Sequence, residues 1–453
     1  MTTYHNWFNN TSSANKSAKK FEPKNKLPDN LLITDEFAAA FQQMEYTDDC
    51  VYITGKAGTG KSTLLKFFRQ NTSKNVVVLA PTGIAALNAE GATIHSFFRF
   101  APQLSKKETI VKDHSRHQLF RQLDMIIIDE ISMVRADVLD CIDYALKINR
   151  NDYSPFGGVQ MVFLGDVYQL APVVAGKETA AYLDRRFGGP YFFNATVLAG
   201  VNLEYIELQT IFRQKDAAFK DLLNSIRANN ITNGQLQQLN KQYLPGYTPA
   251  ATDVSLTLTT TNQIADDANK SRMQSLQAPE FTYPAIIKGK FEPSAYPADP
   301  NLVLKEGAQV IMLKNDSLKR WVNGSIGIVE SLSDNSVTVK LNDISYTIDR
   351  AEWEVIAYQY NTRSKKIEAV VTGSFKQYPL KPAWAITIHK SQGQTYDKVI
   401  IDLGTGAFAH GQTYVALSRC TSLEGIVLKK QIRHQDIIVD PKVAQFIKQR
   451  TSW

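Results

Sequence analysis

The sequence predicts an α/β protein with two domains, each organised around a parallel sheet. Two series of apolar, strand-like runs alternate with helical patterns, one between Leu32 and about Asn202 and the other from about Leu203 onward. Such alternation is typical of parallel sheets covered by helices on both faces. A length of 453 residues fits two large domains that each bury a core. We therefore expect two stacked domains with a cleft between them.

Composition narrows the class of protein. Hydrophobic residues make up 43% of the chain and charged residues 21%, and no run reaches the ~18 apolar residues that a membrane span needs. We expect no integral membrane segment. The net charge of +7 weakly favours an anionic partner. Cys50, Cys141 and Cys420 follow no metal-ligand spacing, which favours buried thiols in a reducing compartment.

Residues 1–30 are predicted to form a flexible basic tail. They are rich in Asn, Ser, Thr and Lys and lack the apolar segment of a secretory signal. They also lack arginine and contain Glu22 and Asp29, which disfavours a mitochondrial transit peptide. We expect a cytoplasmic, nucleoid-associated location in a bacterium, or the nucleus or mitochondrion in a eukaryote.

The first α/β domain is predicted over residues 31–205. Its strands are expected at Val51–Thr54, Val76–Ala80, Met125–Asp129 and Val159–Gly165. The segment Phe97–Leu119 interrupts the alternation because it carries Pro102 and many basic residues. We expect an inserted arm that acts as a wedge or contact surface. A plain surface loop with a solvated charged face is the alternative.

The second α/β domain is predicted over residues 206–322 and 383–440. Its strands are expected at Ser255–Thr260, Gln309–Leu313, Trp384–Thr387 and Val399–Leu403. Between its two parts, residues 323–382 begin with the turn dipeptide Asn323-Gly324 and continue as short alternating runs. This pattern predicts a small antiparallel β-barrel inserted into the second domain. A C-terminal helix is expected over residues 441–453.

A phosphate-binding loop is predicted at Gly55–Ser62, which reads GKAGTGKS between an apolar strand and a helical pattern. The glycines let backbone N–H groups converge on the phosphates of a nucleoside triphosphate, and the helix N-terminus adds partial positive charge. Lys61 is expected to reach the β- and γ-phosphates, and Ser62 to hold Mg²⁺. A glycine-rich loop without a ligand is the alternative, but strand, glycines, lysine, hydroxyl and helix all agree.

Two later segments supply candidate catalytic groups. The apolar strand ending in Asp129 and Glu130 places two carboxylates beside the loop, where Asp129 can orient Mg²⁺ and Glu130 can polarise the attacking water. Helix capping is the alternative for this acidic pair. Gln169, in the segment Gly165–Pro172, has the neutral donor and acceptor groups that can sense a γ-phosphate. A plain turn is the alternative there.

Two arginines of the second domain complete the predicted site. Arg213 lies in the segment Leu208–Gln214 and Arg419 in the segment Gln412–Arg419. They can reach a γ-phosphate only if the cleft closes around the nucleotide, so binding would drive closure of the domains. Surface salt bridges are the alternative.

These segments together resemble the PIF family of superfamily 1 DNA helicases, relatives of the RecD-type enzymes, from about Leu32 to Leu428. Seven blocks occur in the order of that family, and a looser block lies at Tyr191–Ala195. The seven blocks are Gly55–Thr63, Ala80–Leu87 with Thr93–Phe98, Asp129–Glu130, Gly165–Pro172, Phe212–Gln214, Ala385–Thr395 and Tyr414–Arg419. The resemblance implies two RecA-like domains, an arm on the first, a small barrel on the second, and 5′-to-3′ movement on single-stranded DNA.

The resemblance also implies binding residues. Contacts to ATP are implied for Gly55, Ala57, Gly58, Thr59, Gly60, Lys61, Ser62, Thr63 and Gln394. Contacts to DNA are implied for Thr82, His95, Phe97, Thr387, His389, Ser391 and Gln392. Hydroxyl and imidazole groups suit a moving protein because they bond phosphates one at a time and release them, and an aromatic ring can stack on a base. Burial in the core is the alternative for Phe97 or its neighbour Phe98.

The chain departs from the family upstream of the phosphate loop. Relatives carry a glutamine there that recognises adenine, whereas the segment Thr34–Phe37 ends in Phe37 at that place. Gln42 or Gln43 could substitute from a neighbouring helical position, so selectivity for adenine stays open.

The function implied is an ATP- and Mg²⁺-dependent DNA helicase in replication, repair, recombination or telomere-type maintenance. Its substrates would be single-stranded DNA and tailed duplex, with G-quadruplex and RNA–DNA hybrid as further candidates. We expect a monomer that works with replication or repair proteins. An RNA helicase, a translocase that strips proteins, and an ATP-gated binding subunit are the alternatives.

Overall fold

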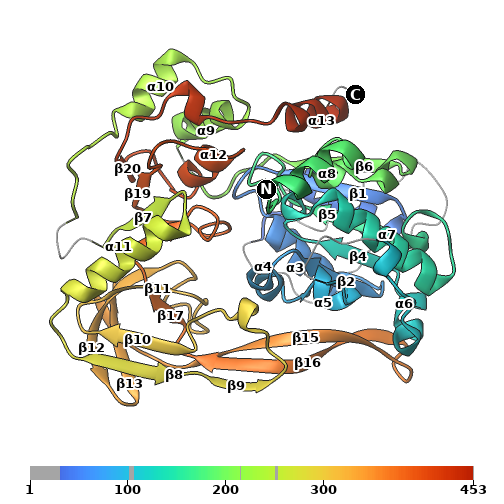
Figure 1. Ribbon diagram of the computed structural model, residues 1–453, viewed down its shortest axis with the longest axis horizontal. Helices are drawn as coiled ribbons and strands as arrows, with labels where there is room; N and C mark the ends of the chain where they lie inside the picture. Colours follow the sequence, from blue (N-terminus) through green and yellow to red (C-terminus); the bar gives the residue numbers. More distant parts are fainter. Residues whose placement is uncertain (1–30, 102–106, 215, 250–253, 452–453) are drawn as a thin grey trace.

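The computed structural model describes residues 31–101, 107–214, 216–249 and 254–451, so the predicted tail over residues 1–30 lies outside the described residues. Two α/β domains, lobe 1 and lobe 2, lie side by side (Figure 1). A third part, the β-module over residues 280–382, lies below both in this view and is built from antiparallel strands. The two predicted α/β domains are confirmed.

Lobe 1 is built on a six-stranded parallel sheet with the order β3-β2-β4-β5-β1-β6. Its strands are β1 (Cys50–Gly55), β2 (Val76–Ala80), β3 (Ala92–Thr93), β4 (Met125–Ile128), β5 (Gln160–Leu164) and β6 (Leu203–Leu208). Strands β1, β4 and β5 are buried along their whole length, as expected for a sheet covered on both faces. All four predicted strands of this domain are present.

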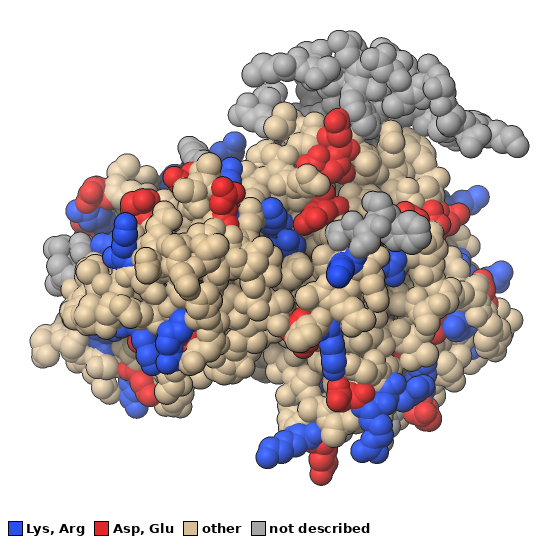
Figure 2. Space-filling model, turned by 90° about the horizontal axis from the view of Figure 1, so that it is seen from above, with Lys and Arg blue, Asp and Glu red and all other residues tan. Residues whose placement is uncertain are grey.

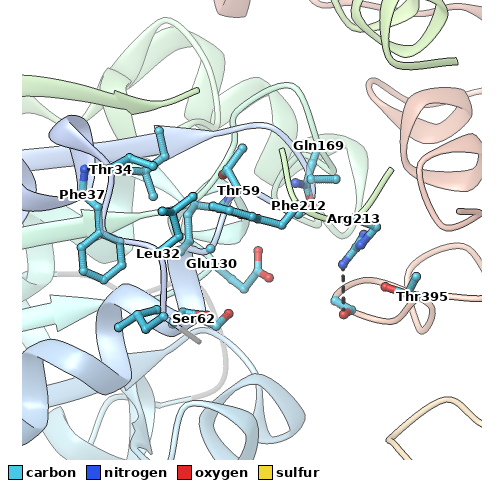
Figure 3. A pocket seen from close by; sticks show the side chains of 18 of the residues that line it. Leu32, Thr34, Phe37, Thr59, Ser62, Glu130, Gln169, Phe212, Arg213 and Thr395 are labelled. Carbon is cyan, nitrogen blue, oxygen red and sulfur yellow. Dashed lines mark hydrogen bonds between the residues drawn. The ribbon is translucent and has the colours of Figure 1, made fainter. Parts of the chain in front are cut away.

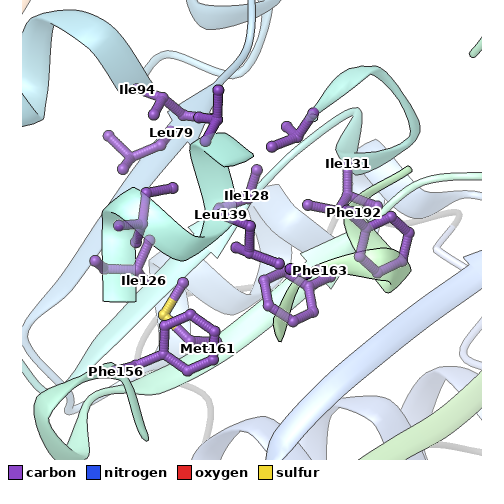
Figure 4. Close-up of a cluster of buried hydrophobic side chains, with 14 of the residues drawn as sticks. Leu79, Ile94, Ile126, Ile128, Ile131, Leu139, Phe156, Met161, Phe163 and Phe192 are labelled. Carbon is purple, nitrogen blue, oxygen red and sulfur yellow. The ribbon is translucent and has the colours of Figure 1, made fainter. Parts of the chain in front are cut away.

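Helices cover both faces of the lobe 1 sheet. They are α2 (Asp35–Tyr46), α3 (Lys61–Asn71), α4 (Gly83–Asn88), α5 (Ile94–Phe98), α6 (His117–Arg121), α7 (Ala136–Arg150) and α8 (Lys177–Phe187). Figure 4 shows part of the core, where apolar side chains of β2, β4 and β5 meet Leu139 of α7 and Phe192. A separate cluster fills the space between the other face of the sheet and helices α2 and α3. Because helices cover both faces of the sheet, the carboxyl end of β1, where the phosphate loop begins, is held in place.

Lobe 2 is built on a four-stranded parallel sheet with the order β18-β7-β19-β20. Its strands are β7 (Leu256–Thr259), β18 (Ala385–Thr387), β19 (Val399–Asp402) and β20 (Ile426–Leu428). Its helices are α9 (Ala217–Arg227), α10 (Asn233–Asn240), α11 (Asn262–Ser275) and α12 (Gln412–Leu417). Three of the four predicted strands lie in this sheet.

The fourth predicted strand of lobe 2 was wrongly assigned to the parallel sheet. Strand β11 (Gln309–Met312) pairs antiparallel with β12 (Ile326–Ser333) and β17 (Leu380–Pro382). The sheet has the order β14-β13-β12-β11-β17, with β13 (Ser336–Leu341) and β14 (Ile344–Ile348). The predicted insert at residues 323–382 is therefore antiparallel, but its sheet begins earlier than residue 323.

The rest of the β-module also begins before residue 323. Strands β8 (Glu280–Pro284) and β10 (Asn301–Lys305) form a pair. Strands β9 (Ile286–Gly289), β15 (Ala351–Asn361) and β16 (Lys366–Gln377) form a three-stranded sheet with the order β15-β16-β9. The paired strands β15 and β16 form a long hairpin that extends from the β-module along lobe 1 (Figure 1).

The hairpin is bonded to lobe 1 at its far end. The hydroxyl of Tyr358 accepts a hydrogen bond from the backbone N–H of Val78 at 3.1 Å and donates to its carbonyl at 3.3 Å. Tyr358 is 6% exposed and packs against Phe97. The backbone N–H of Ile367 donates to the side chain of Asn75 at 3.0 Å. The β-module is thereby attached to both lobes.

The prediction of an inserted arm over Phe97–Leu119 needs partial correction. Phe97, Phe98 and Leu119 are buried in the lobe 1 core, because the apolar ends of the segment pack under the sheet instead of leaving it. Residues 102–106, which include Pro102, lie outside the described residues. Of the predicted arm, only the stretch between these buried ends carries exposed charge, as at Arg99.

The C-terminal helix α13 (Pro441–Thr451) returns from lobe 2 to lobe 1, as Figure 1 shows. Phe446 stacks on Phe193 with ring centroids 4.3 Å apart, and Val443 is fully buried in the lobe 1 core. The hydroxyl of Tyr191 in lobe 1 donates to Asp440 at 2.7 Å. The chain therefore crosses between the lobes a second time just before α13.

Candidate nucleotide site and nucleic-acid cleft

The phosphate loop connects β1 to α3 and requires glycine at two positions. Gly58 has φ +83° and Gly60 has φ +90°, a left-handed region that residues with a Cβ rarely adopt. A Cβ on Gly58 would also lie 2.4 Å from the Cβ of Arg213, so the loop and lobe 2's first segment approach closely. The backbone N–H of Phe212 donates to the carbonyl of Gly58 at 2.9 Å. The loop is thus held against the chain that leads into lobe 2.

Lys61 lies inside the curve of the loop. Its ammonium donates to the carbonyl of Gly55 at 2.6 Å and to the carbonyl of Lys56 at 3.2 Å. Burial lowers the pKa of Lys61. A buried ammonium held only by carbonyls gains from an anion placed beside it, because the anion offsets the desolvation of its charge.

One cavity of about 770 Å³ contains most of the predicted catalytic groups (Figure 3). Lys61, Glu130 and Gln169 come from lobe 1, whereas Arg213 and Arg419 come from the chain of the second predicted domain. The other lining residues are Leu31, Leu32, Thr34, Phe37, Ala57, Gly58, Thr59, Gly60, Ser62, Thr63, Leu208, Phe212, Gly393 and Thr395. The structure therefore brings the two arginines to the same cavity as the phosphate loop.

Glu130 has the character of a general base. Burial, with the neighbouring carboxylate of Asp129, raises the pKa of Glu130 to about 7. Burial also raises the pKa of Asp129, whose carboxylate accepts the backbone N–H of Glu130 at 3.0 Å. Glu130 has φ +52°, a conformation uncommon for a residue with a Cβ. A carboxylate that titrates near neutral pH can take a proton from water efficiently.

Asp129 is not among the residues that line the cavity, whereas Ser62 is. Carboxylate and hydroxyl oxygens are ligands that Mg²⁺ accepts, with substrate phosphates and water completing its coordination. The donor set of Asp129 and Ser62 therefore fits a Mg²⁺ ion that arrives with a nucleotide. Among the described residues, no group of three or more His, Cys, Asp or Glu side chains forms a site for a metal on its own.

The two arginines lie together without carboxylate partners. The guanidinium of Arg213 donates to the carbonyls of Ser418 at 3.4 Å and Gly393 at 3.5 Å. Burial, with the adjacent charge of Arg419, lowers the pKa of Arg213 to about 9. Arg419 is 1% exposed and donates to the hydroxyl of Ser418 at 2.9 Å. Within the described ranges neither forms a salt bridge, which contradicts the alternative of two surface ion pairs.

Sequence reasoning missed a buried ion pair between the lobes beside this cavity. Arg227, at the end of α9, lies 3.1 Å from Asp166 and 3.5 Å from Glu207. The Asp166 side chain is 0% exposed and that of Arg227 is 11% exposed. The guanidinium of Arg227 also lies 4.4 Å from the ring centroid of Tyr168. An arginine four residues after the buried Leu223 of an amphipathic helix was the available signal.

Two further contacts between the lobes were missed. The hydroxyl of Tyr414 accepts a hydrogen bond from the backbone N–H of Ala57 in the phosphate loop at 3.3 Å. His410 lies 2.7 Å from the carbonyl of Val167 through Nε2, while its Nδ1 accepts the N–H of Asp440 at 3.0 Å. With Nδ1 accepting, Nε2 carries the proton and donates to Val167. Lobe 2 therefore contacts both the phosphate loop and the segment that carries Gln169.

The predicted nucleotide contacts fall into two groups. Ala57 and the stretch Gly58–Thr63 line the cavity. Gly55 does not line it and instead bonds Lys61 through its carbonyl. The prediction that Gln394 contacts the nucleotide needs correction, because its side chain bonds Tyr396 and Asn323 and lines a different cavity. Its neighbours Gly393 and Thr395 line the nucleotide cavity instead.

A second cavity of about 760 Å³ lies where lobe 1, lobe 2 and the β-module meet. Of the predicted DNA-binding residues, Thr387 and Gln392 line it, together with Lys390 and Trp353. The lining also includes residues of α4, α11, β10 and β18, among them Ile84, Leu87, Asn88, Asp266, Asn269, Lys270, Leu302, Val303, Ala385 and Ile386. Burial, with the charge of Lys390, lowers the pKa of Lys381 in this cavity to about 8.

Gln392 connects the two cavities. Its amide donates to Glu130 at 2.9 Å and to the side-chain oxygen of Gln169 at 3.4 Å. It therefore contacts the candidate base and the candidate phosphate sensor in the nucleotide cavity while lining the second cavity. One side chain therefore contacts groups of both cavities.

The other predicted DNA contacts lie apart from the second cavity. Thr82 is exposed and caps α4 by accepting the N–H of Ala85. His95 and His389 are half-buried, and burial lowers the pKa of both imidazoles. These three side chains keep surface that a phosphate can contact, so their role stays a prediction.

Two predicted DNA contacts need correction in this conformation. Phe97 is 3% exposed and packs between Phe98 and Phe120, so its ring is part of the core and has no free face for a base. Ser391 is fully buried, and its hydroxyl donates to the carbonyl of Ile388 at 2.8 Å. In both cases the side chain satisfies the fold instead of a ligand.

Charge does not separate on the face shown in Figure 2, where basic and acidic side chains are interspersed. A strand of nucleic acid would therefore meet scattered cations and polar groups on this face, not one continuous basic surface.

No helix among the described residues is long and apolar enough to cross a membrane.

The two parallel-sheet lobes enclose one cavity, which holds a phosphate loop, a catalytic carboxylate and two arginines. This arrangement defines a two-lobed nucleoside-triphosphate-driven motor. The family model for PIF1-like helicases matches residues 33–238. The chain belongs to the PIF1-like helicase family.

Three comparisons describe the similarity. The chain is 31% identical to the ATP-dependent DNA helicase PIF1 of Emericella nidulans, over 87% of this chain and 60% of that protein. It is 37% identical to unliganded Pif1 from Bacteroides, with a TM-score of 0.85 and coverage of 93% of this chain and 98% of that one. A Bacteroides Pif1 structure with ADP-AlF3 and single-stranded DNA gives a TM-score of 0.67 at the same identity and coverage. The chain thus spans about 60% of the length of the fungal relative.

Proposed function

We propose that this protein is an ATP-dependent DNA helicase that moves 5′-to-3′ along single-stranded DNA and separates duplex. One observation carries the proposal: a single cavity holds the phosphate loop lysine, a carboxylate with a pKa near neutral, and two arginines that form no salt bridge with any described residue. These are the groups that phosphoryl transfer uses to bind and cleave a γ-phosphate.

The steps of hydrolysis follow from the positions of the side chains. Lys61 offsets charge on the phosphates, and Glu130 in its ionised form takes a proton from the attacking water. Arg213 and Arg419 stabilise the charge that develops on the transferred group. Mg²⁺ would be held by Ser62 and Asp129 with the nucleotide phosphates, where it neutralises phosphate charge.

DNA is the proposed track for two reasons. Gln392 lies between the catalytic carboxylate and the second cavity, so nucleotide state and occupancy of that cavity are coupled by direct contact. The Bacteroides relative described with single-stranded DNA also differs more from this structure than the unliganded relative does, with TM-scores of 0.67 and 0.85. We propose that DNA binding rearranges the lobes and the β-module in this chain too.

Separating a duplex requires work at each step. Each base-pair step costs ~1.4 kcal/mol, and the separated strands must be kept from pairing again. The β15–β16 hairpin and the exposed part of the predicted arm around Arg99 are the surfaces that could stand between the strands.

We place the protein in the cytoplasm of a bacterium as a monomer, in contact with replication or repair proteins.

Strand separation on tailed duplexes tests the proposal. With ATP and Mg²⁺, a duplex with a 5′ single-stranded tail should be unwound, and one with a 3′ tail should not. Lys61→Ala should abolish ATP hydrolysis and unwinding while single-stranded DNA still binds. Unwinding that survives Lys61→Ala would contradict the motor.

The same preparation separates the alternatives. ATPase stimulation by RNA equal to that by DNA would favour an RNA helicase. Turnover stimulated by DNA without strand separation would favour a translocase that strips proteins. No turnover by the folded chain would favour an ATP-gated binding subunit.

A further inference from the structure

One end of the nucleotide cavity is apolar. Arg213 and Thr395 lie at one end of the view in Figure 3, and Phe37 and Thr34 lie at the other, with Leu32 between them and Thr59. Leu31 and Leu208 also line the cavity. Since the arginines mark the γ-phosphate end, the apolar end is where the base of a bound nucleotide would lie.

Two exposed side chains of the cavity offer apolar contact to a base: Leu32, toward the apolar end, and Phe212, which lies between Thr59 and Arg213 in Figure 3. Leu32 is 62% exposed and Phe212 is 50% exposed, although both are large and apolar. Phe212 lies over the phosphate loop, with a ring carbon 3.9 Å from the position of a Cβ on Gly60. An exposed aromatic ring that lines a cavity can stack on any base, because every base has a π-face.

The polar side chains beside this end are already in use. The hydroxyl of Thr34 accepts the N–H of Phe37 at 3.3 Å and bonds the carboxylate of Glu36. Glu36 in turn accepts the backbone N–H groups of Gln209 at 3.2 Å and Thr210 at 3.3 Å. These bonds cap α2 and connect it to the end of β6. The side chains of Thr34 and Glu36 therefore cannot turn to a base without breaking them.

The two glutamines near α2 do not replace the missing group. Neither Gln42 nor Gln43 lines the cavity. The amide of Gln43 donates to Asp49 at 3.0 Å. Phe37 occupies the place instead: it is 5% exposed and packs against Phe67 in a tilted arrangement, with ring centroids 5.6 Å apart. Among the described residues, the side chains free to face the base edge at this wall are therefore hydrocarbon.

We infer that the base subsite holds its ligand by apolar contact and stacking alone, so that this protein hydrolyses GTP, and to a smaller extent CTP and UTP, as well as ATP. The inference rests on the proposed function, because it concerns the substrate of the same cavity. A site built to hydrogen-bond a substrate rejects the wrong one by about 10⁴–10⁵-fold, whereas an apolar pocket separates ligands of different size by only about 10–200-fold. Adenine and guanine are nearly equal in size, so their ratio should be small.

Hydrolysis of four nucleotides by the full chain with single-stranded DNA tests the inference. We expect kcat/KM for ATP and GTP to agree within about tenfold, with CTP and UTP lower because a smaller ring stacks less. A preference for ATP over GTP greater than tenfold would overturn the inference and leave the helicase intact. Failure to hydrolyse any nucleotide would instead remove the proposed function.

Two variants locate the cause. Phe37→Gln places an amide at the wall, and an amide can bond the N6 and N7 atoms of adenine as a pair but not the corresponding edge of guanine. The preference for ATP should then rise at least tenfold. Phe212→Ala should instead lower kcat/KM for ATP and GTP by the same factor, because it removes stacking.

A matched control and a second readout keep the test decisive. Phe408→Ala removes a ring that is 64% exposed outside the cavity and should change no ratio and no rate. If Phe37→Gln does not fold, as judged by circular dichroism, Phe212→Ala carries the test alone. A folded Phe37→Gln with an unchanged preference, or a Phe212→Ala that weakens ATP alone, would overturn the inference.

Discussion

Removing Arg227 should destabilise the protein far more than removing an exposed cation. Arg227→Met leaves Asp166, whose side chain is 0% exposed, without its partner at 3.1 Å. At that distance the attraction is about 5 kcal/mol for an effective dielectric constant of about 20. Breaking a buried pair costs about 3–5 kcal/mol, which lowers the melting temperature of a unit this size by roughly 6–20 °C.

Thermal unfolding followed by circular dichroism measures this difference. The control is Lys442→Met, which removes a cation that is 43% exposed from a pair with Asp184 and should cost less than ~1 kcal/mol. A double variant, Asp166→Asn with Arg227→Met, should recover more than half of the loss because no buried charge is left unpaired.

Two results would refute this reasoning. Melting temperatures of Arg227→Met and Lys442→Met that agree within 2 °C, roughly the effect of 1 kcal/mol, would show that the buried pair contributes no more than the exposed one. A double variant as unstable as the sum of its single changes would show that Asp166 and Arg227 do not depend on each other.

Three further predictions concern the site and the helix that closes the chain. Gly58→Ala should abolish ATP turnover in a folded protein, since its Cβ would lie 2.4 Å from that of Arg213; turnover and circular dichroism check this. The pKa of Glu130 near 7 predicts that kcat/KM falls about tenfold per pH unit below 7, because the base must be ionised, and that Glu130→Gln loses this profile. Phe446→Ala should lower the free energy of unfolding by about 3 kcal/mol in urea titrations.

Local patterns allowed much of the site to be predicted. The phosphate loop and Glu130 follow buried strands directly, so their place at the sheet edge depends on neighbours in sequence. Arg213 and Arg419 were found as motif residues, and the cavity then brought them together. Arg227 could not be paired in the same way, because Asp166 is 61 residues away in the chain and no periodicity relates them.

The errors have physical causes as well. The apolar run at Gln309–Leu313 does not tell a parallel from an antiparallel strand, and the pairing is decided by distant partners such as β17. Phe97 and Ser391 have side chains that could contact a ligand. In the structure, however, Phe97 packs in the core and the hydroxyl of Ser391 donates to a backbone carbonyl. A side chain's chemical type does not say which partner it meets.

The return of α13 to lobe 1 limits how the lobes can swing. The polypeptide passes between the lobes once after β6 and again at residues 437–440, where His410 and Tyr191 bond Asp440 from either side. Together with the β15–β16 hairpin, which is bonded to lobe 1 at Tyr358, these two crossings resist sliding or twisting of one lobe past the other. Under the proposed function, each cycle of nucleotide capture and release would therefore return the lobes along the same restricted path.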